Sequence, residues 1–136
     1  MKIRNFNTDD EEFLAKLFLL QDVQQQLFSP PQEEHKFKRW LYTENRYVVE
    51  DEGVKIAYAV ILKSEIRGFF GYAIAENYRG LGKAKYIITL IENECRRLGI
   101  KTLTTNVAVD NIKSIKVLQK SGFRQFLLFE MNIVGK

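Results

Sequence analysis

One stretch of eight residues constrains this chain more than any other, Asn77-Tyr78-Arg79-Gly80-Leu81-Gly82-Lys83-Ala84. The apolar run before it, Phe69 to Ala75, predicts a buried strand, and the apolar residues after it recur at helical spacing. The first N–H groups of a helix have no intrahelical partner, and the helix dipole adds partial positive charge at that end. A strand, a glycine-bearing turn and a helix start together predict a site for an anion.

Two glycines and three cations in and beside this turn suit an anion as large as a diphosphate. Gly80 and Gly82 carry no side chain, so a bulky group can come close to the backbone there. Positive side chains stand at Arg79, Lys83 and Lys85. A phosphate-bearing cofactor is therefore the first functional inference from the sequence.

Two common nucleotide motifs do not fit this turn. A P-loop requires Gly-x-x-x-x-Gly-Lys-Ser/Thr, but Gly82-Lys83 is followed by Ala84, and the position of the first glycine is Asn77. A dinucleotide fingerprint requires Gly-x-Gly-x-x-Gly, and here Lys85 stands in place of the third glycine. Both classes of nucleotide-binding protein are excluded by residue type.

The remaining pattern, Arg79-x-x-Gly82-x-Ala84, resembles the Gln/Arg-x-x-Gly-x-Gly/Ala signature of the GNAT superfamily, the acyl-CoA-dependent N-acyltransferases. A second stretch, which begins 29 residues after Gly82, reads Asn111-x-x-Ser114-Ile115-x-x-Leu118-x-Lys120-x-Gly122-Phe123. It is similar to the C-terminal signature of the same superfamily, Asn-x-x-Ala/Ser-x-x-x-Tyr-x-Lys-x-Gly-Phe. With both motifs in this order and spacing, the resemblance covers essentially the whole chain.

Length and composition are those of a small globular protein. The 136 residues are 46% hydrophobic, so we expect a single N-acetyltransferase domain over 1–136. No run of about 18 apolar residues predicts a membrane span, and the N-terminus lacks the pattern of a signal peptide. With a single cysteine, Cys95, and a single histidine, His35, the sequence predicts a cytoplasmic protein without a disulfide or a metal site.

The two parts of the chain differ in charge. Residues 1–78 carry 10 Lys/Arg and 13 Asp/Glu, a net charge of −3, and residues 79–136 carry 11 and 4, a net charge of +7. A basic second part suits a polyanionic cofactor, and an acidic first part suits a cationic amine. The basic charges are spread over several elements and are not interleaved with aromatic residues, which argues against nucleic acid as the partner.

The sequence predicts a mixed α/β fold with the element order β-α-α-β-β-β-α-β-α-β. The spacing of apolar residues and the glycine, proline and capping positions between them set the boundaries. The expected strands are Lys2–Phe6, Arg46–Glu50, Val54–Leu62, Ile66–Ala75, Thr102–Val109 and Phe123–Val134. The expected helices are one capped by Thr8, then Gln32–Thr43, Gly82–Leu98 and a last one through Lys120, capped by Asp110 or Asn111. Three consecutive strands, with a hairpin turn at Asp51-Glu52-Gly53, form an antiparallel meander, and the third helix makes a right-handed parallel crossover.

The resemblance implies where acetyl-CoA would bind. The diphosphate would lie on the backbone N–H groups of the turn, with Arg79 nearby: Gly80, Leu81, Gly82, Lys83, Ala84 and Lys85. The pantetheine arm would pair like a strand with Tyr72, Ala73 and Ile74, which requires that strand to splay from Thr102–Val109. Asn111 would reach the pantetheine region, and capping of its own helix is equally compatible with its position.

The resemblance also implies direct attack of an amine on the thioester, but the catalytic groups are not identifiable. Many members of the superfamily carry a Tyr as the acid, and the matching position is Leu118. The residues that match known positions of a base are not titratable either, with Gly68 in the middle of one strand. The remaining candidates are Asn106 and Tyr72, and Tyr58 and Glu76 are further polar residues nearby.

Two functions follow from the resemblance. The first is an N-acetyltransferase that moves an acetyl group from acetyl-CoA to a primary amine of a small molecule, a peptide or a protein. The second is a non-catalytic acyl-CoA-binding sensor or scaffold module of the same fold, which the leucine at 118 favours. A short C-terminus would also leave a sheet edge open, so pairing into a homodimer is a further expectation.

Overall fold

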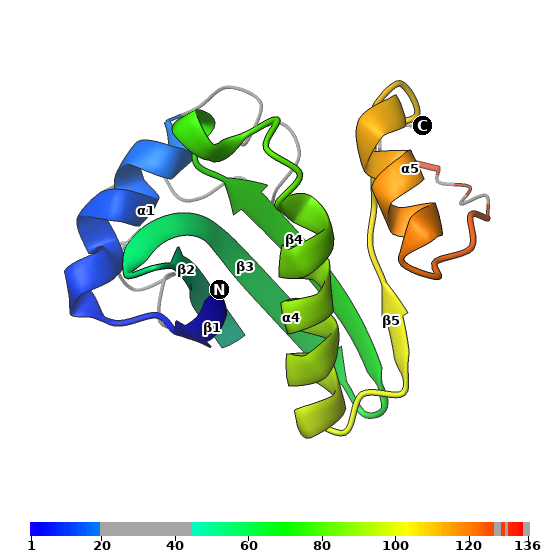
Figure 1. Cartoon of the computed structure of the whole chain (residues 1–136). Coiled ribbons are helices and arrows are strands. Elements are labelled where there is room, and N and C mark those ends of the chain that lie inside the picture. Colours follow the sequence, from blue (N-terminus) through cyan, green and yellow to red (C-terminus); the bar gives the residue numbers. More distant parts are fainter. Residues whose placement is uncertain (20–44, 127–128, 130, 135–136) are drawn as a thin grey trace.

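A five-stranded sheet with the order β1-β2-β3-β4-β5 forms the centre of the computed structural model, which describes residues 1–19, 45–126, 129 and 131–134 (Figure 1). The strands are β1 Lys2–Asn5, β2 Asn45–Asp51, β3 Val54–Ser64, β4 Arg67–Ile74 and β5 Thr102–Thr104. The helices are α1 Glu11–Phe18, α4 Ala84–Arg97 and α5 Ile112–Lys120, with short 3-10 turns η1 Thr8–Asp10 and η2 Glu76–Tyr78. The mixed α/β class is confirmed.

Strands β1 to β4 form an antiparallel meander, and β5 alone runs parallel to its neighbour β4. The predicted turn at residues 51–53 joins β2 to β3, where Glu52 has φ 50° and Gly53 has φ 79°. Two successive positive φ angles match the twist of a tight hairpin. The connection from β4 to β5 runs through α4, as a parallel pair requires a long crossover.

The sheet is covered on both faces because alternate residues of a strand point to opposite sides. One face packs against α4 and α5, through a cluster that includes Phe70, Ile87, Ile91 and Leu118. The other face packs against α1, through a cluster that includes Leu14 and Tyr58. Figure 1 shows α1 and α4 lying apart, on either side of the sheet.

The first helical segment begins one residue earlier than the sequence predicted. Asn7, not Thr8, is the cap, because its side chain accepts a hydrogen bond from Asp9 N at 2.9 Å. Asp10 accepts one from Asn7 N at 2.9 Å, so the two side chains form a reciprocal capping box. The predicted helix Gln32–Thr43 lies outside the described residues.

Two of the predicted strands differ from the structure. β5 has only three residues where Thr102–Val109 was expected, because the chain leaves β4 after Thr104 and loses its hydrogen-bond partner. The described residues of Phe123–Val134 form no strand, so that prediction is wrong for them. A strand needs a neighbour for its N–H and C=O groups, and β5 is the last strand of the sheet.

Candidate functional site

An opening between β4 and β5 is the feature on which the candidate site is built. The two strands pair only at Arg67–Thr102, Gly68–Leu103 and Phe69–Thr104. Thr105 Oγ1 donates a hydrogen bond to Phe70 O at 2.8 Å, and beyond this contact the strands diverge towards the top of Figure 1. The predicted splay next to residues 72–74 is therefore present.

The edge of β4 that faces the opening carries unpaired backbone groups. Ala75 N bonds Ile56 O on the β3 side, and Phe70 O accepts from Thr105 on the β5 side. Because successive residues of a strand direct these groups to alternate edges, Tyr72 and Ile74 face the opening, whereas Ala73 faces β3. Within the described part of the chain, no strand pairs with β4 at this edge beyond its third residue.

The loop from η2 to α4 presents a row of backbone N–H groups beside this opening. Gly80 has φ 73° and Gly82 has φ 72°, a region that other residues rarely adopt. A Cβ at either glycine would meet nothing within 4 Å, so the space beside the loop is open. Among the described residues, none accepts a hydrogen bond from the N–H groups of 80–85. The helix α4 begins with neither a side-chain cap nor an acidic residue in its first turn.

The cations predicted near the turn have different surroundings. Arg79 Nε donates to Ile74 O at 2.8 Å, at the end of the open edge. Lys83 Nζ lies 2.6 Å from Asp51 Oδ2 in the β2–β3 hairpin, and this hydrogen bond raises the pKa of Lys83 and lowers the pKa of Asp51. Lys85 is exposed.

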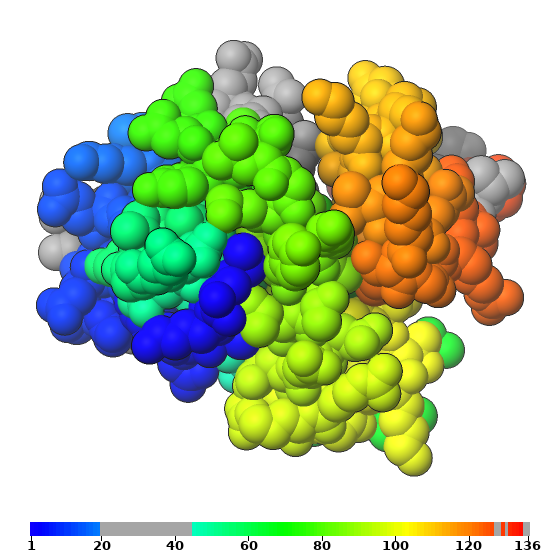
Figure 2. Space-filling view, in the orientation of Figure 1, coloured from blue at the N-terminus to red at the C-terminus, as the bar shows by residue number. Residues whose placement is uncertain are grey.

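The second motif forms α5, which stands on the other side of the opening. Asn111 caps α5, because its Oδ1 accepts a hydrogen bond from Ser114 N at 3.3 Å. Burial raises the pKa of Tyr72, and a hydrogen bond between its hydroxyl and Ser114 opposes that shift. In Figure 2, α5, in orange, lies beside α4, with which it is in contact.

The other candidates for chemistry lie in the core or on the exposed chain after β5. Leu118 is 8% exposed and packs in the core between the sheet and the helices. Asn106 is exposed on the chain after β5. Burial raises the pKa of the Cys95 thiol to about 11, as expected of a core residue and not of a nucleophile. At Gly68, a Cβ would stand 2.8 Å from Ile100 Cδ1, so the side chain of a base has no room there.

Sequence reasoning missed two parts of this arrangement. The partner of Lys83, Asp51, is 32 residues away along the chain, and only its place in a predicted hairpin drew attention to it. Nothing in the sequence indicated that a hydrogen bond from Thr105 would end the β4–β5 pairing.

Among the described residues, no three His, Cys, Asp or Glu side chains gather as metal ligands do, and no helix is long and apolar enough to cross a membrane.

Comparisons with known proteins agree with this geometry. The sequence model of the Acetyltransferase (GNAT) family matches residues 12–123. No curated protein sequence matches the chain. Among solved structures, a spermidine N-acetyltransferase from Vibrio cholerae, in complex with CoA and spermine, is similar with a TM-score of 0.82 and 22% identity, over 96% of this chain and 87% of that one.

Two further structures have the same fold. A ribosomal-protein-alanine N-acetyltransferase from Brucella melitensis is similar with a TM-score of 0.76 and 19% identity, over 91% of this chain and 85% of that one. A putative phosphinothricin N-acetyltransferase has a TM-score of 0.75 and 20% identity, over 96% of this chain and 89% of that one. With a family match over most of its length and this sheet topology, the chain belongs to the GNAT acetyltransferase family.

Proposed function

We propose that residues 1–136 form one N-acetyltransferase domain that transfers an acetyl group from acetyl-CoA to a primary amine. The observation that carries this proposal is the splay of β4 from β5, directly beside a loop whose backbone N–H groups have no acceptor among the described residues. A long cofactor with a diphosphate at one end and amides along its arm matches both features at once.

The loop supplies the site for the diphosphate. The N–H groups of 80–85 and the start of α4 provide aligned donors and the positive end of a helix dipole. Positive φ at Gly80 and Gly82 turns the backbone, and the space beside both glycines is open. Lys83 and Lys85 add charge at the rim, and Arg79 fixes the loop to the end of β4.

The open edge of β4 supplies the site for the pantetheine arm. The N–H and C=O of Tyr72 and the N–H of Ile74 stand where the next strand would pair, so an extended amide chain can take that place. The backbone groups of Ala73 face β3, so this residue would contact the arm only with its methyl group. Asn111 would approach the arm from the cap of α5.

The proposed reaction needs no covalent intermediate with the protein. A free amine attacks the thioester carbonyl, an N–C bond forms, the C–S bond breaks, and the amine proton leaves to solvent. Freeing a lysine-like amine of its proton at pH 7 costs about 4–5 kcal/mol, whereas alignment of two bound reactants contributes about 7–11 kcal/mol. The N–H of Ile74, at the end of the open edge, would stabilise the developing oxyanion.

Tyr72 would assist the departure of the thiolate by hydrogen bonding rather than by giving up its proton. Its pKa is raised above the ordinary value, whereas a thiol has a pKa of about 8.5, so complete transfer from the phenol to the thiolate is uphill. The phenol donates a hydrogen bond, and water supplies the proton. This role accounts for an acetyltransferase whose usual acid position is a buried Leu118.

The direct test is release of free CoA thiol from acetyl-CoA in the presence of a panel of amines. The panel contains a polyamine, a peptide with an N-terminal alanine, a lysine peptide and a small amino acid, because the similar structures carry names of several amine classes. Amine-dependent thiol release, with the acetylated amine identified by mass, supports the proposal. Tight acetyl-CoA binding without release on any amine contradicts it.

That last outcome defines the second candidate, a non-catalytic acyl-CoA-binding sensor or scaffold. The observation that favours it is Leu118, which fills the core where many relatives have an acid. A sensor of this kind would bind acetyl-CoA and change its affinity for a protein partner without consuming the cofactor. Calorimetry with acetyl-CoA and with desulfo-CoA, followed by thiol detection, separates the two functions.

A further inference from the structure

The opening between β4 and β5 begins at a hydrogen bond that a side chain makes. The β4 carbonyl groups that face β5 belong to every second residue, beginning with Ile66, whose O accepts from Thr102 N at 3.2 Å. With the same spacing on both strands, a longer ladder would join Asn106 N to Phe70 O, but among the described residues this bond is absent. Thr105 Oγ1 donates to Phe70 O instead, at 2.8 Å. The hydroxyl therefore takes the acceptor that the next backbone donor would use.

Phe70 is the last residue of β4 before the open edge, and its surroundings hold it in place. The residue is fully buried, so its carbonyl oxygen requires a donor from the protein. Its ring is stacked on that of Tyr72, with centroids 6.3 Å apart, and lies 5.7 Å from the ring of Phe123. Tyr72 is the first residue beyond it whose backbone groups face the opening. A change of donor at Phe70 O would therefore affect the backbone to which the pantetheine arm is proposed to bind.

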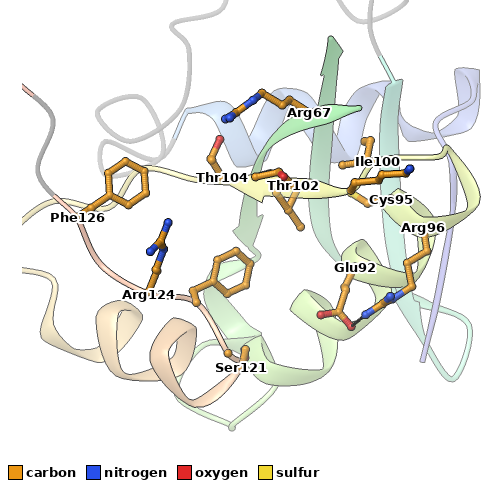
Figure 3. A pocket seen from close by; sticks show the side chains of 14 residues that line it. Arg67, Glu92, Cys95, Arg96, Ile100, Thr102, Thr104, Ser121, Arg124 and Phe126 are labelled. Carbon is orange, nitrogen blue, oxygen red and sulfur yellow. Dashed lines mark ion pairs between the residues drawn. The ribbon is translucent and has the colours of Figure 1, made fainter. Parts of the chain in front are cut away.

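Thr104, one residue earlier, provides a comparison. Its Oγ1 donates to Gly68 O at 3.3 Å, but Thr104 still pairs with Phe69 in the ladder, so this bond adds to the backbone pairing and does not replace it. Among the described residues, Thr102 and Thr104 line a groove of about 510 Å³ along β5, whereas Thr105 is not part of its lining (Figure 3). Of the two adjacent hydroxyls at 104 and 105, the second is the one that lies where the pairing stops.

We propose that Thr105 is a positioning residue for acetyl-CoA, because its hydroxyl satisfies Phe70 O and thereby keeps the edge at Tyr72 open. An open strand edge is a template for pairing with a neighbouring strand. Without the hydroxyl, Asn106 N is the next donor in the repeat, so the ladder would extend and narrow the opening. The cofactor would then have to separate the strands before its arm could bind, which lowers the affinity. This inference rests on the proposed acetyl-CoA site.

Amide hydrogen exchange of the protein without ligand tests what the hydroxyl does. Thr105→Val keeps the shape of the side chain without the hydroxyl, and we expect it to slow exchange of the Asn106 N–H about 10-fold as the ladder extends. Thr105→Ser keeps the hydroxyl and should exchange as the wild type does. Thr104→Val is the matched control, because it removes the adjacent hydroxyl from inside the ladder. Unchanged or faster exchange at Asn106 in Thr105→Val, or equal slowing in Thr104→Val, overturns the proposal.

Calorimetric titration with acetyl-CoA tests the effect on the cofactor site. We expect the Kd of Thr105→Val to rise about 10-fold, and those of Thr105→Ser and Thr104→Val to stay within about 2-fold of the wild type. In thiol release, Thr105→Val should raise KM and leave kcat nearly unchanged, because the strands separate before the chemical step. Thr105→Ala also lacks the hydroxyl and should behave as Thr105→Val does. An equal rise in Kd for Thr105→Ser would mean that the shape of the side chain matters and not its hydroxyl, and overturns the proposal.

The two measurements separate the role of Thr105 from the proposed function. A wild type that binds no acetyl-CoA contradicts both. A wild type that binds and transfers the acetyl group, with Thr105→Val and Thr105→Ala indistinguishable from it, overturns the role of Thr105 and leaves the proposed function in place.

Discussion

Lys83 Nζ and Asp51 Oδ2, 2.6 Å apart, join the start of α4 to the hairpin between β2 and β3. Asp51 is the carboxylate in contact with Lys83, and the nearby Glu52 also raises the pKa of Lys83. Each side chain is about one quarter exposed. The pair therefore fixes the loop and, at the same time, puts a negative charge beside the proposed diphosphate site.

Replacing Asp51 should strengthen cofactor binding. In Asp51→Asn the repelling charge is removed and Lys83 is freed, so we expect the acetyl-CoA affinity measured by calorimetry to rise by a factor of a few, most clearly at low ionic strength. Glu65→Gln removes the same charge from the turn at the other end of β3 and should have no effect. An unchanged or lower affinity in Asp51→Asn would mean that the loop geometry held by the pair matters more than its charge.

The buried carboxylate of Asp10 should make the stability of the protein depend on pH. Its carboxylate is fully buried; burial raises its pKa, but hydrogen bonds from Arg4, at 2.8 Å, from Asn7 N and from Lys55 outweigh that effect and lower it to about 2. A lowered pKa stabilises the folded state above the unfolded value near 4, and this contribution is lost as the pH falls from about 4 to 2.

Asp10→Asn should therefore lower the free energy of unfolding by about 2–3 kcal/mol at pH 7, and the difference from the wild type should shrink towards pH 2. The measurement is urea unfolding at a series of pH values. Asp9→Asn, one residue earlier and exposed, serves as the control. A stability difference that stays constant down to pH 2 would show that the ionised carboxylate is not what stabilises the fold.

A tyrosine at position 118, where many members of the family carry one, should not act as a catalytic acid in this protein. Leu118 packs in the core, so Leu118→Tyr puts a larger ring and an unpaired hydroxyl among buried apolar groups. Overpacking of this kind costs about 1–3 kcal/mol. We expect a lower melting temperature and no gain in the rate of thiol release. A faster enzyme would mean that position 118 turns towards the cofactor when it carries a tyrosine.

Tyr72→Phe tests the hydrogen bond to the departing thiolate. A hydrogen bond to a charged group contributes about 1.5–3 kcal/mol, so the variant should lose about 10- to 100-fold in kcat with little change in KM. Ser114→Ala removes the partner of the hydroxyl on α5 but leaves the phenol in place. An equal loss in both variants would instead indicate that the contact only positions α5.

Local features of the sequence predicted much of the fold and of the cofactor site. The hairpin at residues 51–53, the glycines of the loop and the cap at Asn111 each depend on neighbours within a few residues, and all lie where they were expected. The choice of Asn7 over Thr8 as the first cap depended on Asp10 rather than Glu11 closing the box. Periodicity alone does not distinguish these two registers.

Features that depend on distant partners could not be predicted. The length of β5 is set by where β4 stops offering hydrogen bonds, and the segment after Phe123 has strand-like alternation without a described strand beside it. The bond between Lys83 and Asp51 joins elements that only the fold brings together. The side chain at 118 departs from the family pattern, and only its burial shows that it belongs to the core.

Calorimetric titration of the wild type, Gly82→Glu and Gly99→Glu with acetyl-CoA is the most direct test of the anion site at the start of α4. Both glycines have positive φ, at 72° and 79°, and both have open space beside them, but they stand at opposite ends of α4. We expect the wild type and Gly99→Glu to bind acetyl-CoA, and we expect Gly82→Glu to lose binding through repulsion of the diphosphate. Retained affinity in Gly82→Glu, with both variants folded, would mean that acetyl-CoA does not bind at this loop and that the anion site lies elsewhere.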